Sequence, residues 1–348
     1  PPASRGPMAT MASWPVPSRA RLALSLAVLL PPGSRGLAEG RCEDRNAVCS
    51  DWAAEGECER SPGFMHQQCG RSCGVCTMPG TPFLERMPIL GWGTCCRHSA
   101  TGEPLKASMR DFLRLGGRLL DTAALYNNHR EIGEVLREPE FAWLQREDVF
   151  ITSKVPPADL GGQEVDAAVA RVLEELNTSY VDLMLLHAPG GREANFAAWR
   201  QLEAALAAGR ARAIGVSNFE PGHLQQLAED GAEVAPMNNQ ILLHPGRPQR
   251  ETLEYCRERG ISVTAYHSLR GQGSVPGGPQ AVAAAAAAHG WTEAQVLLRW
   301  GMDHGVSVIP GCTSHEHLRQ ALDAARAGPL RPMELEALGA TVAMRPGP

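Results

Sequence analysis

Val149-Phe-Ile-Thr-Ser-Lys154 and Val181-Asp-Leu-Met-Leu-Leu-His187 are two short apolar runs, and an amphipathic segment, Val165–Leu176, lies between them. A strand, a helix and a second strand in this order predict a parallel strand pair, since a parallel connection needs a long crossover. Each run ends in a polar side chain, Lys154 or His187, whose burial without a partner would be costly. Because the carboxyl ends of parallel strands meet at one edge of a sheet, we expect these two side chains to lie close together.

The same pattern continues on both sides of these runs. Strands are predicted near Ile89–Thr94 and at Arg118–Asp121, Val149–Lys154, Val181–His187, Ala213–Ser217, Ala235–Gln240, Ser262–Tyr266 and Val306–Ile309. Helices are predicted at Leu105–Leu115, Arg130–Arg137, Val165–Leu176, Ala194–Ala208, Pro221–Glu229, Pro248–Arg259, Ala281–His289, Thr292–His304, His315–Ala325 and Pro332–Thr341. Eight strands alternating with helices predict an α/β fold, and eight favours closure into a (β/α)8 TIM barrel over residues 79–348.

Polar side chains end nearly every predicted strand. They are Asp121, Lys154, His187, Ser217 with Asn218, Gln240, and Tyr266 with His267. In a (β/α)8 barrel the carboxyl ends of the strands converge on the face where catalysis takes place. This repeated placement supports closure independently of the strand count, and it predicts a site on that face.

Composition excludes several classes of protein. The 348-residue chain has 33 Lys and Arg against 38 Asp and Glu, a formal net charge of −5. Nucleic-acid-binding proteins usually carry a basic face, so nucleic acid is not an expected partner. No apolar run reaches the ~18 residues of an ordinary membrane-spanning helix. The motifs of Rossmann dehydrogenases, P-loop NTPases, α/β-hydrolases and zincins are absent from the sequence, and no metal site is expected.

Residues 42–76 form a separate cysteine-rich segment. Six of the ten cysteines lie there: Cys42, Cys49, Cys58, Cys69, Cys73 and Cys76. So short a segment cannot bury enough apolar surface to fold alone, and disulfide bonds are expected to stabilise it. Six cysteines allow many pairings, and their spacing does not choose among them. A redox C-x-x-C at residues 73–76 is less well supported, because no strand–helix pattern flanks it. A zinc site is also less well supported, because His66 is the only histidine among these cysteines.

Residues 1–38 are predicted to be a leader. Arg19 and Arg21 precede the apolar run Leu22–Leu30, and the small residues at 36–38 offer a cleavage site. This order is typical of a secretory signal, and the segment that follows requires oxidation. We therefore expect entry into the secretory pathway, with the ER lumen or the cell exterior as destination. An organellar transit peptide is the alternative, because the leader is rich in Arg and Ser and poor in acids.

The cysteine-rich segment is similar to ShK toxin-like (ShKT) domains over its whole length. The resemblance rests on Cys42-Glu-Asp, Cys49-Ser-Asp-Trp, Gly56-Glu-Cys58 and Cys69-Gly-Arg-Ser-Cys73-Gly-Val-Cys76. It implies disulfide bonds that join Cys42 to Cys76, Cys49 to Cys69 and Cys58 to Cys73. Channel-blocking members carry an adjacent Lys-Tyr pair where Gly63 and Phe64 stand here, so toxin activity is not expected.

The barrel segment resembles the aldo-keto reductases over about residues 79–342, through motifs in the family's order. These are Met87-Pro-Ile-Leu-Gly91-Trp-Gly93-Thr94, Arg118-Leu-Leu-Asp121-Thr-Ala-Ala-Leu-Tyr126, Ile151-Thr-Ser-Lys154-Val, Asp182-Leu-Met-Leu-Leu-His187, Ile214-Gly-Val-Ser217-Asn218-Phe219, Asn239-Gln240 and Val263-Thr-Ala-Tyr266. The resemblance implies an oxidoreductase that reduces an aldehyde or ketone with NADPH, or with NADH. It also implies a monomer that acts on a small-molecule carbonyl substrate.

Site roles follow from the resemblance, position by position. In the catalytic set, Tyr126 matches the proton donor, Lys154 and Asp121 match its supporting pair, and His187 matches the histidine that orients the carbonyl. In the cofactor set, Ser217, Asn218 and Gln240 match the contacts to the nicotinamide carboxamide, and Tyr266 matches the ring that stacks beneath the nicotinamide.

The residue types suit this chemistry. No side chain supplies a hydride, so carbonyl reduction requires a nicotinamide cofactor. A free tyrosine has a pKa near ~10, and a cation such as Lys154 within a few ångströms is expected to lower the pKa of Tyr126. Asp121 would keep Lys154 charged and in place. A neutral His187 can donate a hydrogen bond that positions and polarises the carbonyl.

The sequence departs from the family pattern around the expected pocket. Residues 309–317 match the loop that holds the cofactor phosphates, and Cys312 and His317 are assigned to it. NADPH-preferring relatives usually carry Lys where Gly311 stands and Arg where His317 stands. Cys95 and Ala188 stand where the family often has Trp, which implies a more open substrate pocket beside His187.

Two further features of the sequence lie outside these motifs, and one alternative function remains. Adjacent Cys95 and Cys96 are expected to be free thiols, with a strained vicinal disulfide as the alternative. Asn177-Thr178-Ser179 fits the acceptor pattern for N-glycosylation. The rival to an enzyme is a low-turnover, cofactor-binding scaffold whose ShKT-like segment binds an extracellular partner. The intact set of catalytic residues argues against that rival.

Overall fold

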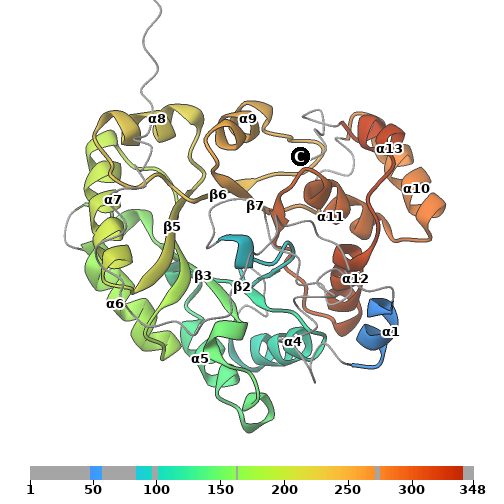
Figure 1. Ribbon diagram of the computed structural model, residues 1–348, viewed down its shortest axis with the longest axis horizontal. Coiled ribbons are helices and arrows are strands. Elements are labelled where there is room, and N and C mark those ends of the chain that lie inside the picture. The colour runs from blue at the N-terminus through green and yellow to red at the C-terminus, as the bar shows by residue number, and fades with distance from the viewer. Residues whose placement is uncertain (1–47, 57–83, 96–100, 162–163, 271–274, 340–348) are drawn as a thin grey trace, which may run out of the picture.

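The computed structural model describes residues 48–56, 84–95, 101–161, 164–270 and 275–339 (Figure 1). The predicted leader, and five of the six clustered cysteines with the pairings implied for them, lie outside these ranges. Within the cysteine-rich segment, the described part forms one short helix, α1 (Cys49–Ala54). No helix in the described ranges is long and apolar enough to cross a membrane.

Eight parallel strands form one sheet in sequence order. They are β1 (Trp92–Gly93), β2 (Leu119–Asp121), β3 (Phe150–Val155), β4 (Val181–Leu186), β5 (Ala211–Ser217), β6 (Asn238–Leu242), β7 (Ser262–Tyr266) and β8 (Ser307–Val308). The register aligns Lys154 of β3 with Leu185 of β4, and Ser217 of β5 with Gln240 of β6. Ser217 and Gln240 are thus directly paired, whereas Lys154 lies two residues before His187 in the register.

The sheet closes into a barrel where its first and last strands meet. Leu90 and Val308 form a parallel bridge. Gly91 N–H donates to Val308 O at 2.9 Å, Val308 N–H to Ile89 O at 2.9 Å, and Gly93 N–H to Pro310 O at 3.1 Å. A side chain on Gly93 would place its Cβ 2.8 Å from the Ile309 carbonyl oxygen, so glycine allows this close approach. The predicted (β/α)8 closure is confirmed.

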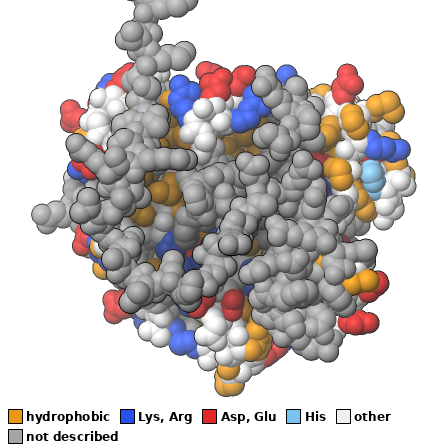
Figure 2. Space-filling view, viewed as in Figure 1, with side chains coloured by type: hydrophobic (Ala, Val, Ile, Leu, Met, Phe, Trp, Pro, Cys, Tyr) orange, Lys and Arg blue, Asp and Glu red, His pale blue; other side chains and the backbone are white. Residues whose placement is uncertain are grey.

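Helices surround the strands on the outside of the ring (Figure 1). They are α4 (Gly102–Arg114), α5 (His129–Leu136), α6 (Glu164–Leu176), α7 (Arg192–Ala207), α8 (Pro221–Glu229), α9 (Arg250–Glu258), α10 (Gly278–His289), α11 (Glu293–Asp303), α12 (His315–Arg326) and α13 (Pro332–Ala337). In α4, Leu105, Met109 and Phe112 recur at helical spacing and are buried against the sheet. Charged side chains of both signs mix on the outer surface (Figure 2).

Strand alternation decides which side chains enter the barrel. A small apolar cluster inside the ring contains Leu119, Phe150, Leu185 and Ala213. Successive side chains point to opposite faces of a strand, so residues two or four positions further along share the same face. Those positions are Asp121, Lys154, His187 and Ser217. The polar strand ends thus continue the inward rows of apolar side chains.

Two local expectations need correction. The predicted strand Ala235–Gln240 lies at Asn238–Leu242, because its pairing with β7 begins at Asn238 and continues through Ile241 and Leu242. Asn238 is buried and donates to Ser262 and Thr264 at 3.0 Å each. The expectation of a free thiol at Cys95 is wrong, since Cys95 is disulfide-bonded, as is Cys49. The cysteines joined to them lie outside the described residues.

Candidate active site

A cavity of about 820 Å³ opens at the carboxyl ends of the strands. Its wall is made of Gly93, Cys95, Asp121, Leu125, Tyr126, His187, Ser217, Asn218, Gln240, Tyr266, residues 267–270 and residues 309–311. All but one of the predicted strand-end residues line it. The exception is Lys154, which is fully buried behind the wall.

Lys154 connects the two predicted partners beside it. Its Nζ donates to Asp121 Oδ1 at 2.7 Å and to the Thr122 carbonyl oxygen at 2.9 Å. Its distance to the Tyr126 hydroxyl is 3.4 Å, within hydrogen-bonding range. Burial alone would lower the pKa of Lys154, but the charge of Asp121 and the Tyr126 hydroxyl outweigh it and raise that pKa. Lys154 is therefore a charged ammonium next to the phenol.

The second oxygen of Asp121 is also bound. Gln240 Nε2 donates to Asp121 Oδ2 at 2.7 Å, and both side chains are buried. The carboxylate therefore accepts hydrogen bonds from β3 on one side and β6 on the other, which fixes its orientation. The sequence did not reveal this contact, because the two residues are 119 positions apart and Gln240 was assigned to the cofactor alone.

Tyr126 stands at the mouth of the cavity on a short 3-10 turn, Ala124–Tyr126. The turn is held by buried polar neighbours that the sequence analysis did not single out. Thr122 donates to Asn128 Oδ1 at 2.6 Å, and Asn128 Nδ2 donates to Thr94 Oγ1 at 3.1 Å. Thr94 and Thr122 directly follow β1 and β2, where the ladders stop and side chains must supply the remaining hydrogen bonds. Asn128 directly precedes α5.

The expected lowering of the Tyr126 pKa is not the net result. Burial raises the pKa of Tyr126, Lys154 lowers it, and Asp121 raises it, so the pKa ends above its ordinary value. Lys154 acts in the predicted direction, but desolvation of the phenolate is the larger effect. Tyr126 therefore holds its proton at neutral pH, which is the state a proton donor needs.

His187 faces Tyr126 across the cavity. The two ring centroids are 5.7 Å apart and the planes meet at 79°. Burial, aided by the charge of Lys154, lowers the pKa of His187 to about 4. Its Nδ1 is buried and has no hydrogen-bond partner among the described residues. The imidazole is therefore neutral at pH 7.

The predicted cofactor residues form a second network. Tyr266 Oη donates to Asn218 Oδ1 at 2.7 Å, and Asn218 Nδ2 donates to Ser217 Oγ at 3.0 Å and to the His187 carbonyl oxygen at 3.2 Å. Ser217 Oγ donates in turn to the Gln240 carbonyl oxygen at 2.9 Å. Asn218 has a positive φ of 61°, a conformation that Asn tolerates better than most residues. The network links the ends of β4, β5, β6 and β7.

The phosphate-loop and pocket residues are only partly brought to the cavity. Gly311 lines it, whereas Cys312 is buried beside it and accepts a hydrogen bond from Trp92 Nε1 through its carbonyl oxygen, at 2.6 Å. His317 lies in the first turn of α12, where its N–H donates to Ser314 Oγ at 3.2 Å. Cys95 lines the cavity, but Ala188 does not.

Metal ligands do not cluster in this region. No group of three or more His, Cys, Asp or Glu side chains in the described ranges could hold a metal ion. The charged and aromatic groups of the cavity are instead arranged around a phenol, an ammonium, a carboxylate and a neutral imidazole.

Comparison with known proteins identifies two families in the chain. The Aldo/keto reductase family matches residues 90–342, and the ShK domain-like family matches residues 41–76. A glyoxal reductase from Bacillus subtilis (strain 168) is 40% identical over 224 residues, which cover 64% of this chain and 78% of the relative.

Two further comparisons extend the match. A 9,11-endoperoxide prostaglandin H2 reductase from Trypanosoma cruzi (strain CL Brener) is 36% identical over 237 residues, 68% of this chain and 81% of the relative. The crystal structure of an aldo/keto reductase from Brucella melitensis superimposes with a TM-score of 0.69 at 27% identity, covering 76% of this chain and all of that one. The chain therefore belongs to the aldo/keto reductase family, as a carbonyl-reducing oxidoreductase whose barrel follows a ShK-like domain.

Proposed function

We propose that the protein reduces an aldehyde or ketone to the corresponding alcohol, with Tyr126 as the proton donor. The observation that carries the proposal is the position of Lys154 Nζ, 3.4 Å from the Tyr126 hydroxyl and 2.7 Å from Asp121. A phenol beside a buried ammonium is suited to proton donation, since the ammonium stabilises the phenolate that forms as the proton leaves.

Each of the other catalytic side chains has a separate task. Asp121 holds Lys154 in place and balances its charge in the dry interior. Neutral His187 donates a hydrogen bond to the carbonyl oxygen, which orients the substrate toward Tyr126 and polarises its C=O bond. Because the charge on that oxygen grows during reduction, both donors act more strongly in the transition state than in the ground state.

Nicotinamide dinucleotides fit the remaining wall of the cavity. Members of the family generally use NADPH or NADH, and a bound reduced nicotinamide supplies the hydride that no side chain can. The Tyr266 ring and the side chains of Ser217, Asn218 and Gln240 border the same cavity as the Tyr126 hydroxyl. We assign these four residues to the nicotinamide end of the cofactor.

Arg270 supports an anionic cofactor. Its side chain is exposed, lines the cavity together with Gly311, and has no carboxylate partner in the described ranges. An unpaired guanidinium suits a phosphate group, because it binds two oxygens at once. Arg270 thus supplies a positive charge close to Gly311, where NADPH-preferring relatives usually carry Lys. The first turn of α12 offers N–H groups beside His317 and Cys312. We propose NADPH as the cofactor, with NADH as a second substrate of the same site.

The substrate side of the cavity is lined by Leu125 and Cys95, next to His187. Leu125 is 55% exposed, so an apolar side chain stands at the entrance. Relatives of this protein include a glyoxal reductase and a prostaglandin endoperoxide reductase, and the substrates in these two names differ widely in size. Cys95 and Leu125 are not aromatic, so this part of the described wall favours aldehydes and ketones of varied size.

The cysteine-rich segment points to an oxidising compartment. Cys49 and Cys95 are both disulfide-bonded, and such bonds persist in the secretory pathway or outside the cell. We propose that residues 1–38 direct the chain there and that the ShK-like domain is stabilised by three disulfide bonds, following the family pairing of Cys42 with Cys76, Cys49 with Cys69 and Cys58 with Cys73.

A Tyr126→Phe substitution in the full-length protein tests the catalytic proposal. The variant is expected to lose at least ~100-fold in kcat with an aromatic aldehyde and NADPH, because the proton donor is gone. Binding of NADPH, followed by fluorescence, should stay unchanged. Tyr255→Phe is the matched control, because Tyr255 packs on α9 beside Arg259 and away from the cavity wall.

Three outcomes separate the possibilities. Undiminished turnover by Tyr126→Phe would refute Tyr126 as the donor. Loss of dinucleotide binding together with activity would indicate a misfolded variant, which circular dichroism would reveal. A wild-type protein that binds NADPH yet turns over no carbonyl substrate would support the low-turnover scaffold instead.

A further inference from the structure

We propose that Asn177 is a site of N-linked glycosylation, placed on the end of the barrel opposite the catalytic cavity. Asn177-Thr178-Ser179 is an acceptor tripeptide. None of the other asparagines in the 348-residue sequence is followed two positions later by Ser or Thr. The structure adds three observations about how this tripeptide is presented.

The first observation is that the tripeptide lies in a turn. α6 ends at Leu176, and Asn177 follows in the left-handed conformation with a φ of 52°. The main chain there is already satisfied, since Asn177 N–H donates to the Glu174 carbonyl oxygen at 3.0 Å and Thr178 N–H to the Leu173 carbonyl oxygen at 3.1 Å. Neither backbone group needs the Asn177 side chain as a cap.

The second observation is that Asn177, the acceptor, and Ser179, which the transferase recognises, face solvent, whereas Thr178 between them does not. Asn177 and Ser179 are exposed, and their side chains make no hydrogen bond within the described part of the chain. Thr178 is half-buried, where its hydroxyl accepts from Arg146 Nε at 3.1 Å and donates to the Tyr180 carbonyl oxygen at 3.2 Å. The acceptor amide and the hydroxyl that a transferase recognises are therefore both available.

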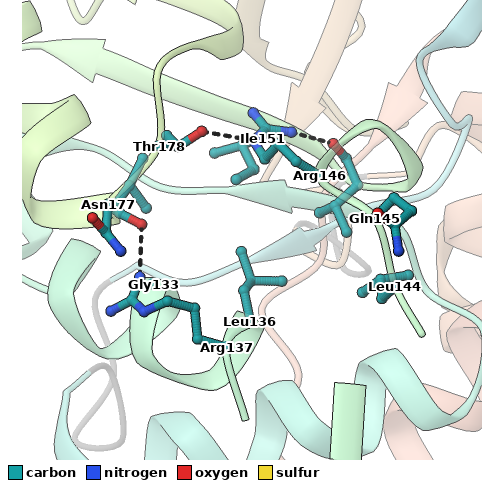
Figure 3. Close-up of a pocket in the computed structure, with 11 residues that line it drawn as sticks. Gly133, Leu136, Arg137, Leu144, Gln145, Arg146, Ile151, Asn177 and Thr178 are labelled. Atoms are coloured by element: carbon teal, nitrogen blue, oxygen red, sulfur yellow. Dashed lines mark hydrogen bonds between the residues drawn. The ribbon is translucent and has the colours of Figure 1, made fainter. Parts of the chain in front are cut away.

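The third observation is a shallow groove beside Asn177, shown in Figure 3. Its volume is about 160 Å³, and its wall combines Leu136, Leu144 and Leu176 with the polar Gln145 and Arg137. Arg137, at the end of α5, donates to the Leu176 carbonyl oxygen at 3.3 Å, next to Asn177 (Figure 3). Asn177 is itself one of the residues that line this groove, so a sugar attached to it would begin at the groove's edge.

The location keeps a glycan away from catalysis. The groove is lined by Val149 and Ile151, at the amino-terminal end of β3, whereas Lys154, near the carboxyl end of the same strand, supports the cavity. A glycan at the amino-terminal end of the barrel leaves the cavity at the other end open, so it is compatible with activity. The amino-terminal end of such barrels carries stability rather than chemistry.

The modification is a group transfer. The Asn177 side-chain nitrogen loses one proton and bonds to the anomeric carbon of a lipid-linked oligosaccharide, and the lipid diphosphate departs as the leaving group. This reaction takes place in the ER lumen, so it requires the chain to enter the secretory pathway. The disulfide bonds at Cys49 and Cys95 are consistent with that compartment.

The experiment expresses the full chain, with its own leader, in a eukaryotic cell line that glycosylates secretory proteins. Digestion with peptide N-glycosidase should increase gel mobility by a single glycan step and leave Asp in place of Asn177, as read by mass spectrometry. Asn177→Gly should abolish the step while accommodating the positive φ. Ser179→Ala should abolish it although Asn177 remains, and Ser179→Thr should keep it.

Every result bears on the proposal. Purified wild-type protein that carries an unmodified Asn177 overturns it, whether or not alkylation shows that Cys49 and Cys95 are oxidised. A glycan that survives in Ser179→Ala overturns the assignment to this tripeptide. Enzymatic removal of the glycan should leave kcat/KM unchanged, and a change would contradict its placement away from the cavity.

Discussion

At the scale of single residues, Lys154 carries a charge that is fully buried and hydrogen-bonded. Asp121 satisfies it, and Gln240 in turn fixes Asp121. Breaking a buried ion pair by removing one partner costs far more than breaking an exposed pair, because it leaves a charge without compensation. Removing either partner of this pair in the candidate site is therefore expected to destabilise the fold.

Lys154→Met is expected to reduce the free energy of unfolding by about 3 kcal/mol, since Asp121 would remain buried beside a thioether. It should also abolish carbonyl reduction. Lys106→Met is the matched control, because Lys106 pairs with Glu134 on the surface between α4 and α5, and its effect should be much smaller. Urea unfolding of both variants measures the difference. Equal stability losses would contradict the isolation of the Lys154–Asp121 pair from solvent.

A second prediction at the residue scale concerns Arg270. Arg270→Gln is expected to raise the KM for NADPH by about tenfold, which corresponds to ~1.4 kcal/mol of lost binding. Steady-state kinetics with NADPH and NADH locate the phosphate involved. A loss with both cofactors indicates the bridging diphosphate, and a loss with NADPH alone indicates the 2′-phosphate. Arg171→Gln on α6 is the control, and an unchanged KM for both cofactors in Arg270→Gln would contradict the assignment.

At the scale of secondary-structure elements, β3 is anchored from outside the barrel as well as from inside. His129 of α5 is buried, with Nε2 3.0 Å from Ser153 Oγ on β3 and Nδ1 3.1 Å from Glu175 Oε2 on α6. Burial lowers the pKa of His129, although Glu175 opposes the shift. The neutral ring thus donates to Glu175 and accepts from Ser153, which joins three elements behind Lys154.

His129→Leu is expected to lower the free energy of unfolding by about 2 kcal/mol, because Ser153 would lose its partner in a dry environment. His315→Leu on the exposed start of α12 is the comparison, and it should leave stability nearly unchanged. Chemical denaturation measures both. If the two substitutions have the same effect, His129 does not hold β3 in place.

The elements also show how far sequence patterns reach. Strand positions near the barrel centre follow from apolar runs, and seven of the eight predicted strands overlap their observed cores closely. β6 is displaced because its pairing with β7 begins at Asn238 and continues past Gln240 to Leu242. The inward set of Asp121, Lys154 and His187 was predictable from strand alternation. The Gln240–Asp121 bond was not, because it depends on side-chain rotamers across the barrel, and neither was the disulfide bond at Cys95.

At the scale of the whole molecule, folding removes several histidines from water. Burial lowers the pKa of His129, His187, His244 and His304, and that of His187 falls to about 4. A histidine in the unfolded chain titrates near pH ~6.5. Below that pH the unfolded state therefore binds more protons than the folded state, and the free energy of unfolding must fall as the pH falls.

Stability is thus expected to decrease from pH 7.5 to pH 5.5, as measured by the urea midpoint at constant ionic strength. Carboxylates do not account for a decrease in this window. The pKa values of Glu316 and Glu334 are lowered to about 2 by their neighbours, so their stabilisation is lost only below the ~4.3 of an unfolded glutamate. A midpoint that stays level or rises on acidification would show that these histidines remain solvated.

The seam of the barrel has a consequence for how a large ligand gains access. β1 and β8 are the shortest strands, and three main-chain hydrogen bonds hold them together. Local opening of a barrel is favoured at the strand pair that the fewest hydrogen bonds hold together. That joint borders the cavity through Gly93 and residues 309–311, on the far side of the ring from β4. The seam is therefore expected to open more readily than the longer pairing of β3 with β4, on the side of the cavity where Gly93 and residues 309–311 lie.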